Sequence, residues 1–178
     1  AAKAAILATL AFHTEVTRDE VFCEGITKLT PEDIAAAAAM GCTVKLLAIA
    51  KTTADDRIVV KVHPTMIGEK HPLASVSGAF NAIFVDSREA GQLMFLGQGA
   101  GGNPTASAVM GDVVTVARNR ARGTASHLSS GYTRRAVAPI GESSAQFYVS
   151  FDVVDRPGIL AKCAAVFGRH NVSLRVVQ

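Results

Sequence analysis

The sequence predicts an α+β fold, with a mixed, largely antiparallel sheet packed with helices and a β-α-β unit at the end. Its composition is that of a globular protein, since 49% of the 178 residues are hydrophobic and 19% are charged. Short apolar runs between turn residues occur in pairs along the middle of the chain, which is typical of antiparallel hairpins. Segments with helical apolar spacing precede and follow these pairs.

The first segment, AAKAAILATLAF, has the apolar spacing of a helix. Its predicted buried stripe consists of Ile6, Leu7, Leu10 and Ala11. Lys3 lies one turn before Leu7 and therefore on the same stripe, where a lysine is unexpected. Two interpretations of Lys3 remain open. Either its side chain bends away to solvent, or it faces a cleft whose surroundings adapt it to proton transfer.

A second helix is predicted to begin at Thr30, which can cap it, with Pro31 at the first helical position. Asp33 completes a capping box with Thr30. The alanines of 35–39 propagate the helix, and Gly41 ends it.

Two hairpins are expected next, followed by a third helix. The four strands are predicted over residues 43–50, 58–63, 79–85 and 92–96. The third helix is predicted from the cap Asn103 to about Arg120, with a broad buried face of valines. Residues 121–145 are rich in Gly, Ser, Thr and Arg, and we interpret them as loop and linker.

Between the last strand and the third helix the sequence reads GQGAGG, in which Gly97, Gly99 and Gly102 satisfy G-x-G-x-x-G. A Rossmann fingerprint would need a second strand ending in an acidic residue about 20 positions further on. Neither is present near Arg122, so this interpretation fails. Two others remain: a turn needed for close helix–strand packing, or a flat backbone wall for a ring or a phosphate.

Charge and cysteine content exclude several classes of protein. The net charge of +3 comes from dispersed residues, so we expect no nucleic-acid partner. No apolar run is long enough to span a bilayer. The three cysteines are scattered without a C-x-x-C pattern, which argues against a zinc site or disulfide framework and favours the cytoplasm. No metal site is predicted in this chain.

Four segments together resemble homoserine dehydrogenase, of the bacterial kind with a C-terminal regulatory extension and nearest to the actinobacterial members. They are AAKAAILATLAFHTEVTRDEVFCEGITKLT, GCTVKLLAIA, HPLASVSGAFNAIFV and GQGAGGNPTASAVMGD, in that order. The resemblance implies that 1–141 is the substrate-binding and dimerisation domain and that a nucleotide-binding Rossmann domain precedes it. In keeping with this, the first helix begins without a cap, so we expect the chain to be a piece of a longer protein.

The last unit, FYVSFDVVDRPGILAKCAAVFGRHNVSLRVVQ, predicts strand 146–154, a helix to His170 and strand 172–177. It resembles the first half of an ACT domain, a ferredoxin-like regulatory unit, so 146–178 is expected to be a partial ACT domain. The resemblance implies that the corner that holds Asp155 and Gly158 either binds an amino-acid effector, threonine by analogy, or packs against a sister domain.

The resemblance also implies an activity: NAD(P)-dependent interconversion of aspartate 4-semialdehyde and L-homoserine, in threonine, methionine and isoleucine biosynthesis. Lys3 aligns with the catalytic lysine of the family, which exchanges a proton with the carbonyl oxygen. The turn containing Gly99, Ala100 and Gly101 aligns with a segment that borders the nicotinamide. The NADP or NAD would be bound mainly by the missing N-terminal domain, and the enzyme is expected to be a homodimer or a higher homo-oligomer.

Two alternatives remain. The chain could serve as a regulatory and oligomerisation module that senses an amino acid, which truncation before Gln146 would test. It could also belong to a related two-domain reductase of amino-acid biosynthesis, which activity on homoserine would separate.

Overall fold

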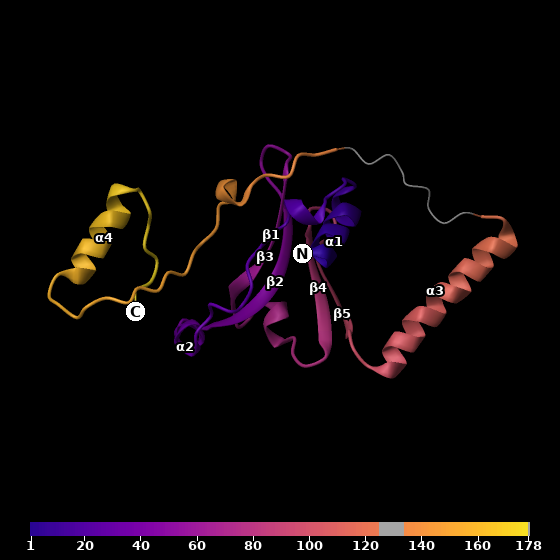
Figure 1. Ribbon diagram of the computed structural model, residues 1–178, viewed down its shortest axis with the longest axis horizontal. Coiled ribbons are helices and arrows are strands. Elements are labelled where there is room, and N and C mark those ends of the chain that lie inside the picture. The colour runs from indigo at the N-terminus through magenta and orange to yellow at the C-terminus, as the bar shows by residue number, and fades with distance from the viewer. Residues whose placement is uncertain (125–133, 178) are drawn as a thin grey trace.

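Two long antiparallel hairpins form the centre of the molecule (Figure 1). The computed structural model describes residues 1–124 and 134–177. In the first hairpin, β2 (Cys42–Thr52) pairs along its whole length with β3 (Ile58–Gly68). The short strand β1 (Phe22–Cys23) adds to the other edge of β3 in parallel, so this sheet is mixed.

The second hairpin consists of β4 (Phe80–Ser87) and β5 (Gly91–Gln98), which pair in full register. All four hairpin strands predicted from the sequence are confirmed, and each is longer than expected because the backbone pairing continues past the apolar runs. With the helices described below, this arrangement confirms the α+β fold with largely antiparallel sheets.

Helix α1 (Ala2–Phe12) packs on the first sheet through its alanines. The buried core cluster that joins them consists of Ala4, Ala5, Ala8, Val16, Val21, Ile58 and Val60. Alanine side chains let the helix axis approach the strands closely, and the branched side chains of β3 then fill the interface.

The predicted buried stripe of α1 is wrong. Ile6, Leu7 and Leu10 are 60%, 42% and 58% exposed, while the alanine face is buried. Both faces have helical spacing, and the smaller residues face the sheet. Lys3 therefore lies on an exposed, apolar helix face rather than in the core.

Helix α2 (Pro31–Ala39) begins at the predicted capping box. Thr30 Oγ1 accepts a hydrogen bond from the Asp33 N–H at 3.2 Å, and Asp33 Oδ2 accepts one from the Thr30 N–H at 3.0 Å. The Tyr148 hydroxyl donates to the other carboxylate oxygen of Asp33 at 3.0 Å. Hydrogen bonds from the Thr30 backbone and hydroxyl, and then from Tyr148, lower the pKa of Asp33.

Residues 134–142, the strap, pair with the first residue of β3. The Ile58 N–H donates to the Ala136 carbonyl at 3.0 Å, and the Ala138 N–H donates back to the Ile58 carbonyl at 2.8 Å. These bonds form a parallel bridge between Ile58 and Val137. Part of the predicted linker is thus an added edge of the first sheet.

Two interactions that involve side chains also hold the strap in place. The Arg135 N–H donates to Thr14 Oγ1 at 2.7 Å, just beyond the end of α1. Arg57 forms an ion pair with Glu142 of the strap. The middle of the predicted linker, residues 125–133, lies outside the described residues.

Helix α3 (Gly102–Arg122) extends away from the two sheets (Figure 1). It begins at the N-cap Gly101, two residues before the predicted cap Asn103. The predicted buried face is wrong, because no residue of this fully described helix is buried. Its exposed apolar side chains are Val109, Met110, Val113, Val114 and Val116.

Helix α4 (Ile159–Arg169) confirms the predicted C-terminal helix. The flanking segments 146–154 and 172–177 are not strands, although the Arg175 guanidinium donates to Gln146 Oε1 at 3.3 Å. The two strands of a split β-α-β unit lie on either side of a third strand. The described residues supply no such strand here, so neither segment pairs with a strand.

Lys61 on β3 is 5% exposed, and its burial, with a smaller effect of Lys51, lowers its pKa from the usual 10.5. Lys61→Met is expected to raise the free energy of unfolding at pH 7 by about 1 kcal/mol, because a desolvated charge is removed. A lowered folded-state pKa means that the cost is full below that pKa and is relieved as pH rises through it towards 10.5. The gain from Lys61→Met should therefore shrink in urea unfolding above pH 10.

Lys70→Met, at an exposed lysine just beyond the end of β3, is the control and should change stability little at either pH. A Lys61→Met protein less stable than the wild type at pH 7 would contradict the prediction.

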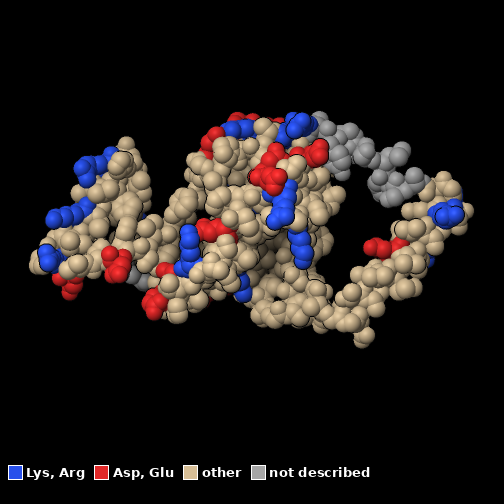
Figure 2. Space-filling model, in the orientation of Figure 1, with Lys and Arg blue, Asp and Glu red and all other residues tan. Residues whose placement is uncertain are grey.

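Charges are mixed over the visible surface: basic and acidic side chains alternate on the central body, and most of α3 is uncharged (Figure 2). Among the residues described, none of the helices has the length and apolarity to cross a membrane. No group of His, Cys, Asp and Glu in the described ranges is arranged to hold a metal ion.

Candidate active site

The exposed face of α1 presents Lys3 beside apolar side chains. Lys3 lies three and four positions before Ile6 and Leu7, and hence next to both on the helix surface. It forms no hydrogen bond or ion pair with another described residue. A cation surrounded by exposed leucine and isoleucine is unusual for a solvated face, and is typical of a surface that another part of a protein covers.

The glycine turn, Gly99–Gly102, connects the end of β5 to α3. The Gly99 N–H donates to the Ala79 carbonyl at 2.9 Å, which carries the pairing of β4 and β5 one residue further. Gly101 has φ of 124°, a conformation that favours glycine, and a Cβ there would lie 3.3 Å from Pro104 Cδ. The turn thus favours glycine at 101, because a side chain there would strain the backbone and crowd the Pro104 ring.

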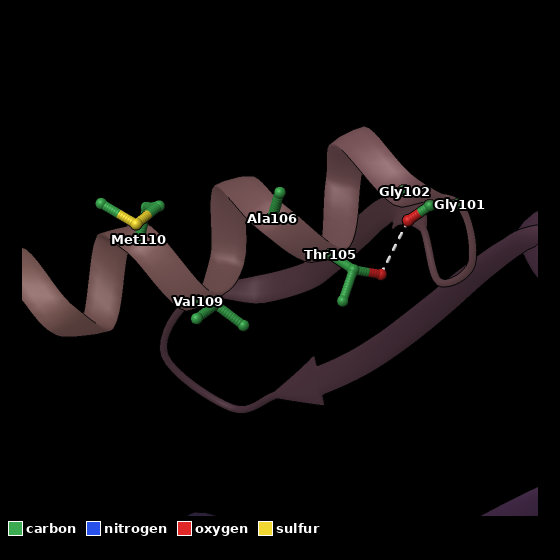
Figure 3. A pocket seen from close by; sticks show the side chains of 6 residues that line it. All are labelled: Gly101, Gly102, Thr105, Ala106, Val109 and Met110. Carbon is green, nitrogen blue, oxygen red and sulfur yellow. Dashed lines mark hydrogen bonds between the residues drawn. The ribbon is translucent and has the colours of Figure 1, made fainter.

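A shallow, open groove follows the turn along the first turns of α3 (Figure 3). The residues lining it are Gly101, Gly102, Thr105, Ala106, Val109 and Met110. Thr105 Oγ1 donates to the Gly101 carbonyl at 2.7 Å, so the hydroxyl is engaged by the helix. The remaining lining is largely apolar, and Gly101 adds no side chain to it. This surface fits the face of a planar ring.

Of the three residues predicted to contact the cofactor, only Gly101 lines this groove. Thr105, Ala106, Val109 and Met110 were missed. Counted from Gly102 they follow at three, four, seven and eight positions, which is one helical stripe. The sequence therefore contains the signal, but only Val109 and Met110 of this stripe belong to the predicted buried face.

The structure does not bring the predicted site residues together. Lys3 lies on α1 beside the first sheet, and the glycine turn lies where β5 leads into α3 (Figure 1). Asp155 and Gly158 lie at a third place, before α4, and both are exposed. Gly158 has φ of 85° and is the N-cap of α4, so the predicted corner exists as a turn.

Comparison with known proteins identifies the family. A family model described as homoserine dehydrogenase matches residues 1–114. The homoserine dehydrogenase of Mycobacterium tuberculosis is 51% identical over 182 aligned residues, which include 100% of this chain and 41% of that protein. Those of Mycobacterium leprae and Corynebacterium glutamicum are 52% and 48% identical, with the same coverage. The chain thus spans about two fifths of the length of these relatives.

Solved structures agree with the sequences. The homoserine dehydrogenase of Thiobacillus denitrificans superposes on 99% of this chain with a TM-score of 0.85 and 31% identity, and the chain covers 42% of it. The Staphylococcus aureus homoserine dehydrogenase at pH 7.5 covers 66% of the chain with a TM-score of 0.60 and 35% identity, and 29% of its own length is matched. With relatives of 48–52% identity along its whole length, the chain belongs to the homoserine dehydrogenase family.

Proposed function

We propose that this chain is the substrate-binding part of an enzyme that interconverts L-homoserine and aspartate 4-semialdehyde with NADP or NAD. The observation that carries the proposal is the 51% identity over the whole chain to proteins named homoserine dehydrogenase. We further propose that 1–141 forms the substrate and dimerisation domain, that 146–178 belongs to an ACT unit, and that the remaining family length supplies the nucleotide-binding domain. The enzyme would act in the cytoplasm, in threonine, methionine and isoleucine biosynthesis.

In the proposed chemistry, Lys3 is the residue that transfers the proton. In the oxidative direction the lysine amine takes the hydroxyl proton of homoserine, and in the reductive direction the ammonium returns a proton to the carbonyl oxygen. The nicotinamide cofactor, when bound, exchanges the hydride. The apolar side chains of Ile6, Leu7 and Leu10 would exclude water around Lys3 once the rest of the enzyme covers this face.

The proposed place for the nicotinamide is the groove that begins at the glycine turn, with Gly99, Ala100 and Gly101 as backbone contacts. Its apolar lining and the missing side chain at Gly101 support this assignment. Because the hydride and the proton go to the same carbonyl group, this assignment requires Lys3 and the groove to lie side by side in the assembled enzyme. The exposed faces of β4 and β5 fit a subunit interface, in keeping with a homodimer or higher homo-oligomer. Their exposed apolar side chains include Phe80, Ile83, Leu93, Phe95 and Leu96.

The test is homoserine-dependent reduction of NADP and NAD by the full-length protein, followed by absorbance at the wavelength of the reduced nicotinamide. Oxidation of homoserine is expected, with little activity on other amino-acid alcohols. Activity confined to another substrate would indicate a related reductase of amino-acid biosynthesis and would refute the assignment.

The second candidate function, a regulatory module, is favoured by the distinct C-terminal helix and its glycine corner. Threonine is expected to inhibit the full-length enzyme through the corner that holds Asp155 and Gly158. An enzyme truncated before Gln146 should keep its basal activity and lose the response to threonine. Titration of both forms with threonine measures this, with alanine as the control ligand. Equal responses of the two forms would exclude 146–178 as the sensor.

A further inference from the structure

The side chain of Asn81 on β4 packs closely against the backbone of Gly99, just beyond the end of β5. Asn81 pairs with Gly97, two residues before Gly99, and a Cβ built on Gly99 would lie 1.4 Å from Asn81 Nδ2 and 2.6 Å from its Cγ. The Asn81 carboxamide therefore occupies the space that a side chain at position 99 would fill.

Backbone conformation gives no reason for glycine at this position. Gly99 is absent from the glycines with positive φ, in contrast to Gly101. The neighbouring carboxamide is thus the only steric requirement for glycine at 99 that the described residues impose. Substitution of Gly99 would force the Asn81 side chain to rotate away, since its amide is the far end of a flexible side chain.

The Asn81 carboxamide is also not engaged elsewhere. Asn81 is exposed, and its side chain forms no hydrogen bond with another residue of the described chain. Its packing against Gly99 is consequently the main structural role available to it. That packing acts on the segment that leads directly into Gly101 and the groove along α3.

We propose that Asn81 is a positioning residue for the glycine turn: its carboxamide packs on Gly99 and fixes the path of Gly99–Gly101 at the cofactor groove. This inference rests on the proposed function, because it takes the groove to be the nicotinamide site. Asn81 acts through the turn and by the shape of its side chain. Its loss should weaken the productive placement of the cofactor without altering proton transfer at Lys3.

The experiment is a double-mutant cycle in the full-length enzyme, with KM and kcat for the cofactor and the dissociation constant of NADPH from its fluorescence. Asn81→Ala is expected to raise the KM and dissociation constant by about tenfold with kcat changed less than about twofold. Gly99→Ala should have a similar effect, because it displaces the same carboxamide. The double variant should be no worse than either single one, since the alanine methyl then fills the vacated space.

Two further variants separate positioning from other roles. Asn81→Leu keeps the branched shape and removes the hydrogen-bonding groups, and it should restore the KM to near the wild-type value. Gln92→Ala removes an exposed amide at the opposite end of β5 and should leave all constants unchanged. Wild-type cofactor affinity in Asn81→Ala, additive effects of the two single changes, or failure of Asn81→Leu to rescue would each overturn the proposal.

The outcomes also distinguish this inference from the proposed function. If the wild type binds NADPH but does not oxidise homoserine, the proposed function fails, and the dissociation constants still decide the role of Asn81. If homoserine is oxidised and Asn81→Ala behaves as the wild type, only the inference about Asn81 fails. A wild-type protein that binds no NADPH would overturn both.

Discussion

Lys3→Ala in the full-length enzyme is expected to lower kcat for homoserine oxidation by about 10²–10⁴-fold, the usual contribution of a positioned proton-transfer group. The affinity for NADP or NAD should change little, because Lys3 lies on α1 and the proposed cofactor groove lies along α3. Since the Lys3 side chain is exposed and outside the core cluster, the variant should remain folded. Steady-state kinetics with either cofactor, together with a thermal unfolding curve, measure both effects.

Lys70→Ala is the matched control, as it removes another exposed lysine outside the proposed site. Its kcat should equal that of the wild type. A near-normal kcat in Lys3→Ala would remove the assignment of Lys3 and leave the proton transfer to another group.

Ile58→Ala is expected to lower the free energy of unfolding by about 3 kcal/mol, because a large aliphatic side chain is lost from a close-packed site. Ile58 is 0% exposed and packs with the alanine face of α1. The cavity would lie under the helix that carries Lys3, so turnover should also fall. Urea unfolding at fixed pH gives the first effect, and kinetics below the unfolding transition give the second.

Leu46→Ala serves as the comparison, since Leu46 lies on β2 and is 52% exposed. Its cost should be below about 1 kcal/mol. A cost of similar size at Leu46 and Ile58 would mean that the buried cluster around α1 is not the main source of stability.

Local signals predicted the secondary structure well. The capping box of Thr30 and Asp33 placed the start of α2, because those contacts are made within three residues. The hairpins were equally accessible, since short connections join strands that pair with each other. Helix caps and hairpins form between residues that are close in the sequence, so the local sequence is enough to predict them.

The buried faces of the helices were harder to predict. Helix α1 carries two stripes of helical spacing, and hydrophobicity favoured the larger side chains of Ile6, Leu7 and Leu10. The sheet instead selects Ala4 and Ala8, because small side chains permit close approach. Which stripe faces the sheet depends on how the helix and the sheet pack together. Helical periodicity alone does not distinguish the alanine stripe from the stripe of larger side chains.

The candidate site was predictable only in part. Gly101 could be proposed from the glycine-rich segment itself, as could the helical stripe that follows it. The contact between Asn81 and Gly99 could not, because it depends on the register of β4 and β5. The C-terminal strands likewise need a neighbouring strand that the described residues do not supply.

The strap places a limit on how the C-terminal unit could be exchanged between proteins. Its backbone supplies a donor and an acceptor to Ile58, and Arg135 reaches Thr14 at the end of α1. A chimera joined ahead of Arg134 would replace the segment that bonds to Ile58 along with the proposed sensor. A junction just before Gln146 leaves these bonds in the recipient, so grafting of a foreign sensor is best attempted there.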